Sequence, residues 1–272
     1  MPNVSMPSSD WRPAWVRALE SRLLRNCPLP TDHYWTRPGS VLGLIRPDPW
    51  QLEALASTEA THLFLCTRQG GKSTVASGLA LQAAIIEAPA LILLLSPTLR
   101  QSGELFRDKV LRLYNALGRP VEAVQETALS LTLANGSRII SLPGNEEGIR
   151  GFSGVNLLVI DEAARVPDEL YYAVRPMLAV SQGRLVALST PYGKRGWFYE
   201  EWVGANNWHR VRISALECPR IRPEFLAEER RSLGDRWFAQ EYMNSFEDVI
   251  DAVFCQEDID AAASDDVQPL WR

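Results

Sequence analysis

The sequence predicts an α/β fold in which a mostly parallel sheet is flanked by helices. Short apolar runs recur along the chain and alternate with longer stretches of helical character, a pattern typical of parallel sheets. The chain has 272 residues, of which 46% are hydrophobic, so it is long enough to bury a substantial core. We therefore expect one large domain with a smaller appendage.

The expected strands are short and apolar, and they are separated by helical stretches. Strands are expected at residues 63–66, 91–96, 157–161, 185–189 and 211–213, and helices at 48–57, 73–87 and 102–116. A hairpin interrupts this alternation, because Leu129, Leu131 and Leu133 alternate with smaller or polar residues up to the tight-turn dipeptide Asn135-Gly136. An antiparallel excursion is therefore expected before the strand at 157–161.

The chain divides into four expected segments. Residues 1–43 form an N-terminal arm rich in Pro, Trp and Arg, and 44–215 form the α/β core. Residues 216–250 form a small helical lid, because apolar residues recur at helical spacing in the charged stretch from Pro223 to Phe246. Residues 251–272 form an acidic linker without further alternation of strands and helices.

Composition excludes several classes of protein. The formal net charge of -5 argues against a broadly basic nucleic-acid-binding face, although a small basic patch is compatible with it. The four cysteines are scattered and form no CxxC pair, which argues against a disulfide framework or a zinc site and favours a reducing cytoplasm. The longest apolar run is too short to cross a bilayer, so we expect a soluble protein with no membrane partner.

The segment from Cys66 to Thr74 lies between an expected strand and an expected helix, where a Walker A phosphate loop works. In such a loop Gly71 lets the backbone approach the phosphates, Lys72 reaches the β- and γ-phosphates, and Ser73 ligates Mg²⁺. Cys66 stands where the general motif has its first glycine, and a glycine-rich helix cap is the alternative interpretation. The predicted ATP-binding residues are Cys66, Thr67, Arg68, Gln69, Gly70, Gly71, Lys72, Ser73 and Thr74.

Two acids end the apolar strand at 157–161 and have the Walker B form. Asp161 and Glu162 are expected at the carboxyl edge of the sheet, where α/β proteins bind ligands. Asp161 would hold Mg²⁺, while Glu162 would orient and deprotonate the attacking water. A surface acid pair is the alternative, and the phosphate loop upstream favours the catalytic interpretation.

Phosphoryl transfer also needs a cation to offset charge on the transferring group. The candidates are Arg68, inside the loop, and Arg150, in a glycine-flanked segment before the second motif. Gln51 could contact adenine, and the hydroxyls of Ser189-Thr190-Pro191 could sense the γ-phosphate. A solvated arginine is the alternative for Arg68 and for Arg150. Taken singly, Gln51 would be read as a surface residue and Ser189-Thr190-Pro191 as an ordinary turn at the end of a strand.

Together, these motifs occur in the order seen in the ATPase domains of phage large terminases, which the sequence resembles over most of its length. The matching segments are Trp50-Gln51, Arg68-Gln69-Gly70-Gly71-Lys72-Ser73 with Cys66 before it, Ile149-Arg150-Gly151, Val159-Ile160-Asp161-Glu162-Ala163, Ser189-Thr190-Pro191, Glu241-Tyr242 and Val253-Phe254. The resemblance implies a P-loop NTPase of the additional-strand, conserved-glutamate type. It also implies ATP hydrolysis, with ATP and Mg²⁺ bound, that drives double-stranded DNA into a procapsid.

The resemblance further implies a role for each predicted site residue. Gln51 would lie at the adenine, Glu162 would be the catalytic carboxylate, and Ser189, Thr190 and Pro191 would form the coupling motif. Arg150 resembles the arginine that such motors insert into a neighbouring subunit's site, and Arg68 is its rival. The implied partners are double-stranded DNA, further copies in a homo-oligomeric ring, a portal and a small terminase subunit, in the cytoplasm of an infected bacterial host.

The sequence supports three further expectations. Large terminases usually continue into a nuclease domain, but Asp258, Asp260, Asp265 and Asp266 lie in a tail without apolar strands, so we expect no nuclease activity. Lys194 and Arg195 are weak candidates for DNA contacts. The rival functions are a helicase or translocase of another family and a nucleotide-regulated assembly protein with little hydrolysis.

Overall fold

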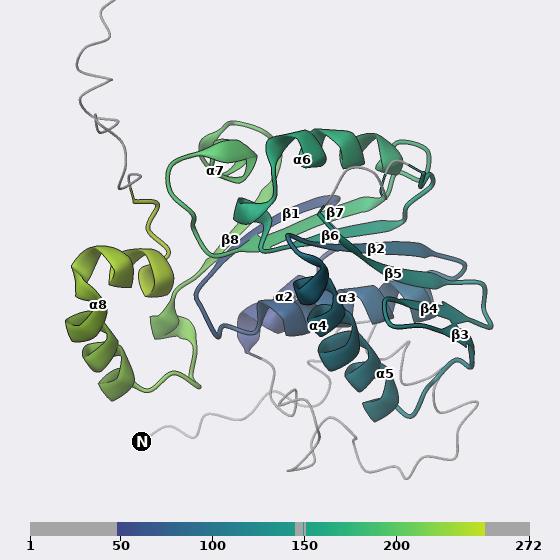
Figure 1. Cartoon of the computed structure of the whole chain (residues 1–272), viewed down its shortest axis with the longest axis horizontal. Helices are drawn as coiled ribbons and strands as arrows, with labels where there is room; N and C mark the ends of the chain where they lie inside the picture. Colours follow the sequence, from purple (N-terminus) through teal and green to yellow (C-terminus); the bar gives the residue numbers. More distant parts are fainter. Residues whose placement is uncertain (1–47, 145–148, 150, 248–272) are drawn as a thin grey trace, which may run out of the picture.

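A computed structural model describes residues 48–144, 149 and 151–247 (Figure 1). The expected N-terminal arm, the expected linker at 251–272 and Arg150 lie outside these residues. The described part contains an eight-stranded sheet in the order β3-β4-β5-β2-β6-β7-β1-β8. Helices cover both faces of this sheet, which confirms the predicted α/β fold.

The sheet is parallel except at one end. Its parallel strands are β5 (Arg138–Pro143), β2 (Leu91–Ser96), β6 (Leu157–Asp161), β7 (Arg184–Ser189), β1 (Thr61–Cys66) and β8 (His209–Ile213). The antiparallel end consists of β3 (Ala123–Glu126) and β4 (Ser130–Leu133), which pair with each other and, through β4, with β5. The predicted hairpin around Asn135-Gly136 is therefore present, and β3 extends it.

Strand β7 lies between the two strands that carry the predicted motifs. Ala187 of β7 is in register with Leu63 of β1 on one side and with Ile160 of β6 on the other. Because these strands are parallel, the ends of β1 and β6 meet at the same edge of the sheet. Strand β7 is the additional strand of the predicted fold type.

Side chains on the two faces of each strand enter separate cores, as expected for a sheet that is buried on both sides. One core joins Phe64 and Leu94 to α2 (Pro49–Ala56), α3 (Lys72–Ile86) and the helical segment made of α4 (Leu99–Leu105), η2 (Phe106–Leu111) and α5 (Arg112–Ala116). The other joins Leu63 and Leu93 to η4 (Ala163–Arg165), α6 (Asp168–Val174), η5 (Arg175–Leu178) and α7 (Gly196–Val203). Figure 1 shows these two groups of helices on opposite faces of the sheet.

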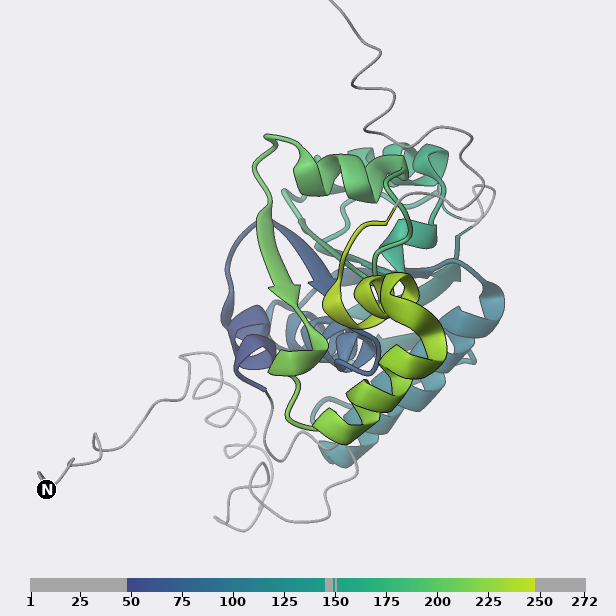
Figure 2. The same ribbon diagram turned by 90° about the vertical axis from the view of Figure 1, so that its left-hand side faces the viewer.

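A small helical appendage, which we call the lid, follows β8 and consists of η6 (Ala215–Glu217) and α8 (Pro223–Met243). Its apolar residues Ala215, Leu226, Phe238 and Tyr242 form a separate cluster. Gly234 has a left-handed backbone conformation, with φ of 78°, and bends α8 in its middle. Figure 2 shows the bent helix beside the edge of the sheet where the parallel strands end.

The structure also differs from the sequence-based expectations in several places. The helix expected at 102–116 begins at Leu99, where Thr98 accepts a hydrogen bond from the Gln101 backbone at 3.2 Å, and it contains the π-helical segment η2. Strand β3 and helices α6 and α7 were not expected. No helix in the described ranges is long and apolar enough to cross a membrane.

Candidate nucleotide-binding site

The predicted phosphate loop joins the end of β1 to the start of α3. Gly71 is the residue before α3 and has a φ of 93°, a conformation that favours glycine. A Cβ atom at Gly71 would lie 2.4 Å from Nε2 of Gln51, so a side chain there would collide with the Gln51 amide. The loop therefore needs glycine both for its backbone turn and for its contact with α2.

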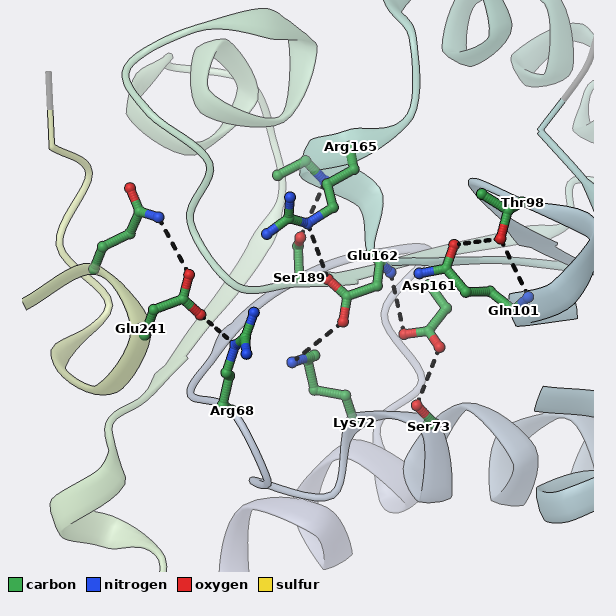
Figure 3. A network of polar contacts seen from close by, with 12 residues as sticks. Arg68, Lys72, Ser73, Thr98, Gln101, Asp161, Glu162, Arg165, Ser189 and Glu241 are labelled. Carbon is green, nitrogen blue, oxygen red and sulfur yellow. Dashed lines mark hydrogen bonds and ion pairs between the residues drawn. The ribbon is translucent and has the colours of Figure 1, made fainter. Parts of the chain in front are cut away.

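Lys72 and Ser73 bring the loop to the two predicted acids (Figure 3). The Lys72 Nζ atom lies 3.7 Å from Oε1 of Glu162, and the Ser73 hydroxyl donates to Oδ2 of Asp161 at 3.1 Å. Residues that are 88 positions apart in the sequence thus meet through a hydrogen bond. The predicted pairing of the two motifs is present as a direct contact.

Asp161 and Glu162 occupy different environments although they are adjacent. Asp161 is buried, and burial raises its pKa to about 6, with the neighbouring Glu162 carboxylate acting in the same direction. Glu162 has a left-handed backbone, with φ of 51°, and begins the turn into η4. Non-glycine residues in this conformation often occur at functional sites, and here the turn directs the Glu162 side chain towards Lys72.

The loop and Glu162 border a cavity of about 720 Å³, and Asp161, which is buried, does not line it. Five of its lining side chains are cationic and one is a carboxylate, although the whole chain has a net charge of -5. Such a local excess of positive charge suits a polyanionic ligand. The lining residues are Gln51, Arg68, Gln69, Gly70, Gly71, Lys72, Ser73, Thr74, Gln101, Lys109, Glu162, Arg165, Thr190 and Arg220.

Gln51 and Arg220 line this cavity beside Gly71. Gln51 is buried, and its Oε1 atom accepts a hydrogen bond from the Asp48 backbone at 3.0 Å. The Arg220 guanidinium forms two contacts with the Asp48 carboxylate, at 2.9 and 2.8 Å, and donates to the Gly70 carbonyl at 3.1 Å. Arg220 thus connects the segment before α8 with both α2 and the phosphate loop.

The predicted coupling motif begins at the last residue of β7, and its three residues have different surroundings. Thr190 lines the cavity, whereas Ser189 is fully buried and its hydroxyl accepts a hydrogen bond from the Ala164 backbone at 3.1 Å. Pro191 is buried and does not line the cavity. Ser189 therefore links this motif to the turn after the two acids.

Arg68 contacts the lid. Its Nε atom lies 2.5 Å from Oε2 of Glu241, and its backbone N–H donates to the Glu241 carbonyl at 3.2 Å (Figure 3). The Asn244 amide, just beyond α8, donates to the Leu65 carbonyl at 3.2 Å and to the Ile213 carbonyl at 2.5 Å. The end of the lid is thus bound to the ends of β1 and β8.

Two of the predicted loop residues do not line the cavity. Cys66 is the last residue of β1, and burial raises the pKa of its thiol, so its side chain belongs to the core. Thr67 is also buried, and its hydroxyl donates to the Glu241 carbonyl at 3.2 Å. Arg150 lies outside the described residues, as do the tail acids, while Arg195 is exposed with its guanidinium over the Tyr192 ring.

Four cavity residues were missed by the sequence analysis: Gln101, Lys109, Arg165 and Arg220. Gln101 and Lys109 come from the helical segment after β2, and Arg220 comes from the start of the lid. Only Arg165 is close in sequence to a predicted motif, since it follows Glu162 by three residues. The position of Arg165, three residues after Glu162, is the one signal in the sequence that could have identified it as a site residue.

The polar atoms near Ser73 fit a bound Mg²⁺. The Ser73 hydroxyl and the Asp161 carboxylate are hard oxygen donors held 3.1 Å apart, and Mg²⁺ in nucleotide sites typically takes one or two such protein ligands together with phosphates and waters. The described residues contain no group of three or more His, Cys, Asp or Glu that could hold a metal ion by itself.

Comparisons with known proteins agree with this arrangement. The family model described as terminase large subunit, T4likevirus-type, N-terminal, matches residues 63–261. No curated protein sequence matches the chain.

Solved structures of phage large terminases share the fold. The ATPase domain of the Thermus phage P74-26 large terminase is 23% identical, with a TM-score of 0.65, over 75% of this chain and 95% of that one. The large terminase of another thermophilic bacteriophage, in complex with ADP, is 15% identical, with a TM-score of 0.61, over 74% and 54% of the two chains.

The large terminase of bacteriophage HK97 is 18% identical, with a TM-score of 0.57. The match covers 75% of this chain and 51% of the HK97 chain, so this chain spans about half of that protein. The family match over residues 63–261, the cavity and the strand order all agree. The chain belongs to the terminase large subunit family and has the fold of its ATPase domain.

Proposed function

We propose that this chain is the ATPase motor domain of a large terminase, which couples ATP hydrolysis to the movement of double-stranded DNA into a procapsid. The observation that carries the proposal is the cationic cavity lined by the phosphate loop and Glu162, beside the contact between Ser73 and Asp161. A triphosphate fits its charge, and the carboxylate of Glu162 provides a base at the same edge of the sheet.

In this proposal the nucleotide lies along the cavity with its base near Gln51 and its phosphates at the loop. The Gln51 Oε1 atom is already occupied by the Asp48 backbone, so its amide N–H groups remain for an acceptor on the base. Lys72 leaves Glu162 and turns towards the β- and γ-phosphates. The backbone around Gly70 and Gly71 and the N-terminus of α3 surround the phosphate oxygens.

Hydrolysis then depends on Glu162 and on the residues that neutralise the phosphates. Glu162 accepts a proton from the attacking water, a contribution typically worth about 10²- to 10⁴-fold in rate. Ser73 and Asp161 would hold Mg²⁺, which supplies positive charge at the β- and γ-phosphates. Thr190, at the cavity wall, is placed to contact the γ-phosphate side and, through the adjacent Ser189, the turn at Ala164.

The wider assembly is proposed from the family. The chain would act in a homo-oligomeric ring on double-stranded DNA, with a portal and a small terminase subunit as further partners, in the infected bacterial cytoplasm. Either Arg150 of a neighbouring subunit or Arg68 would stabilise charge in the transition state. Arg68 lines the cavity and contacts Glu241, so it can respond both to the nucleotide and to the lid.

The test is steady-state ATP hydrolysis with Mg²⁺ over a range of protein concentrations, with and without double-stranded DNA. We expect Glu162→Gln to lower kcat by at least about 100-fold. The matched control is Glu169→Gln, which changes a glutamate on α6 outside the cavity. We also expect activity per subunit to rise with concentration, and a mixture of Arg150→Ala with Glu162→Gln to recover part of it.

The opposite results separate the alternatives. If the wild type binds ATP but does not hydrolyse it at any concentration, with or without DNA, the motor proposal fails and a nucleotide-regulated assembly protein takes its place. If hydrolysis depends on Glu162 but the protein separates the strands of duplex DNA, it is a helicase rather than a packaging motor.

A further inference from the structure

Glu162 faces two different cations, one on each carboxylate oxygen. Lys72 Nζ lies 3.7 Å from Oε1, and the Nε atom of Arg165 lies 3.9 Å from Oε2 (Figure 3). Both cations line the cavity. When ATP is bound, Lys72 is needed at the phosphates. The contacts described for Arg165 do not give it the same task.

Arg165 is held in place by contacts that do not involve a nucleotide. Its backbone N–H donates to the Glu162 carbonyl at 2.9 Å, and its guanidinium lies over the Tyr192 ring, 4.3 Å from the centroid. The preceding residue, Ala164, donates its N–H to the Ser189 hydroxyl at 3.1 Å. About two thirds of the Arg165 side chain is buried, since its exposed fraction is 33%. A cation over an aromatic face is favoured by the charge distribution of the ring.

These contacts distinguish Arg165 from Lys72. The Lys72 ammonium has two weak contacts, with Glu162 at 3.7 Å and with the Thr67 carbonyl at 3.5 Å, so it can turn away at little cost. The contact of Arg165 with Oε2 is no shorter, at 3.9 Å, but its guanidinium also packs over the Tyr192 ring, and this second contact keeps it beside Oε2 when Lys72 turns away. A general base is most effective when a third group fixes its orientation and leaves one of its atoms free for the proton.

We propose that Arg165 is a positioning residue for Glu162, holding Oε2 so that Oε1 is free to receive the proton of the attacking water once Lys72 has turned to the phosphates. This inference rests on the proposed ATP hydrolysis and names a residue through which Glu162 is oriented. Tyr192 supports the arrangement by packing against the guanidinium.

A double-mutant cycle on the full chain tests this inference, with kcat and KM for ATP measured at saturating Mg²⁺. We expect Arg165→Gln to lower kcat by roughly 10- to 100-fold while KM changes by less than about 3-fold. In the Glu162→Gln background, the same substitution should change the residual rate by less than about 2-fold, because the group that it orients is already gone. Arg165→Lys, which keeps the charge, should recover part of the rate.

The matched control is Arg175→Gln. Arg175 also lies over a tyrosine ring, 5.5 Å from the Tyr171 centroid, and faces a buried glutamate, Glu201, at 3.8 Å, but it lies outside the cavity. Arg175→Gln should leave kcat unchanged. Tyr192→Leu provides a milder variant, expected to lower kcat by about 3-fold, and keeps the test informative if Arg165→Gln does not fold.

Four results would overturn the inference. An Arg165→Gln effect of equal size in both backgrounds would mean that Arg165 acts independently of Glu162. A raised KM with an unchanged kcat would make it a nucleotide-binding cation. An active wild type with unchanged kinetics in Arg165→Gln would remove any role in hydrolysis, whereas an inactive wild type would refute the proposed function itself and, with it, this inference.

Discussion

Asp161 and Glu201 are both buried carboxylates, each with 7% of its surface exposed, yet the fold surrounds them very differently. Asp161 accepts one hydroxyl, from Ser73 at 3.1 Å, and one backbone N–H, from Glu162 at 3.1 Å. Glu201, on α7, accepts hydrogen bonds from Tyr171 at 2.9 Å, from Asn206 at 2.7 Å and from Trp208 at 2.8 Å.

The two carboxyl groups consequently shift in opposite directions. Burial raises the pKa of Asp161 to about 6. Burial also acts to raise the pKa of Glu201, but the hydrogen bonds from Asn206, Tyr171 and Trp208 outweigh it and lower the pKa below its usual value. The fold thus satisfies Glu201 completely and leaves unused acceptor capacity on Asp161, where a ligand is expected.

Asp161→Asn should give the largest effect. The amide keeps the shape of the side chain but removes the charge that would hold a metal ion, so we expect ATP hydrolysis to fall by at least about 100-fold. Because a poorly solvated charge is removed, the melting temperature should stay the same or rise. Calorimetry and an ATPase assay on the same preparation check both statements, and unchanged hydrolysis would show that Asp161 has no part in the reaction.

Glu201→Gln should lower stability and leave ATP hydrolysis unchanged. An amide cannot accept hydrogen bonds at both of its ends, so a donor that now meets a carboxylate oxygen, from Tyr171 or from Asn206 and Trp208, would face an N–H group. We expect the free energy of unfolding to fall by about 1–3 kcal/mol, with kcat per folded molecule unchanged. Urea unfolding measures the loss, and Glu200→Gln, at the exposed neighbouring residue, is the control.

His62 extends the comparison to a buried base on β1, at the end of the strand away from the phosphate loop, and should give the smallest effect. Burial, aided by the charges of His209 and Arg184, lowers its pKa to about 4. The folded protein thus holds His62 neutral while the unfolded chain takes up a proton near its ordinary value of 6.5. The contribution of His62 to stability is therefore complete above that value and is lost as the pH falls towards 4.

Urea unfolding at pH 7.5 and pH 5.0 measures this contribution. Between pH 7.5 and pH 5.0, the urea midpoint should fall more for the wild type than for His62→Gln. Equal falls in the urea midpoint of the two proteins would mean that a group other than His62 causes the loss of stability at pH 5.0.

The parts of the molecule that the sequence predicts are those in which neighbouring residues determine the structure. The phosphate loop between β1 and α3, the acids at the end of β6 and the hairpin at Asn135-Gly136 all depend on short segments. The predicted roles of the site residues remain predictions. Strand β3 was missed because it is short and largely exposed, so it lacks the apolar alternation that marks a strand.

Contacts between distant segments account for what else was missed. Arg220 meets Asp48 across 172 residues, and Arg68 meets Glu241, so neither pair leaves a local pattern. Single charged residues in polar stretches are also the commonest kind of surface residue, and nothing in the sequence separates Arg220 from them. Only the folded arrangement of the lid against the loop identifies Arg220 as a cavity residue and Glu241 as the partner of Arg68, which the sequence already places in the loop.

The lid touches the nucleotide cavity at two separated points. Arg220, before α8, contacts Asp48 and the Gly70 carbonyl, and Glu241, near the end of α8, contacts Arg68. The lid has its own apolar cluster, separate from the two cores of the sheet. Because Glu241 pairs with Arg68, a shift of Arg68 on the phosphate side would act on the far end of α8, while Arg220 keeps the near end of the lid paired with Asp48.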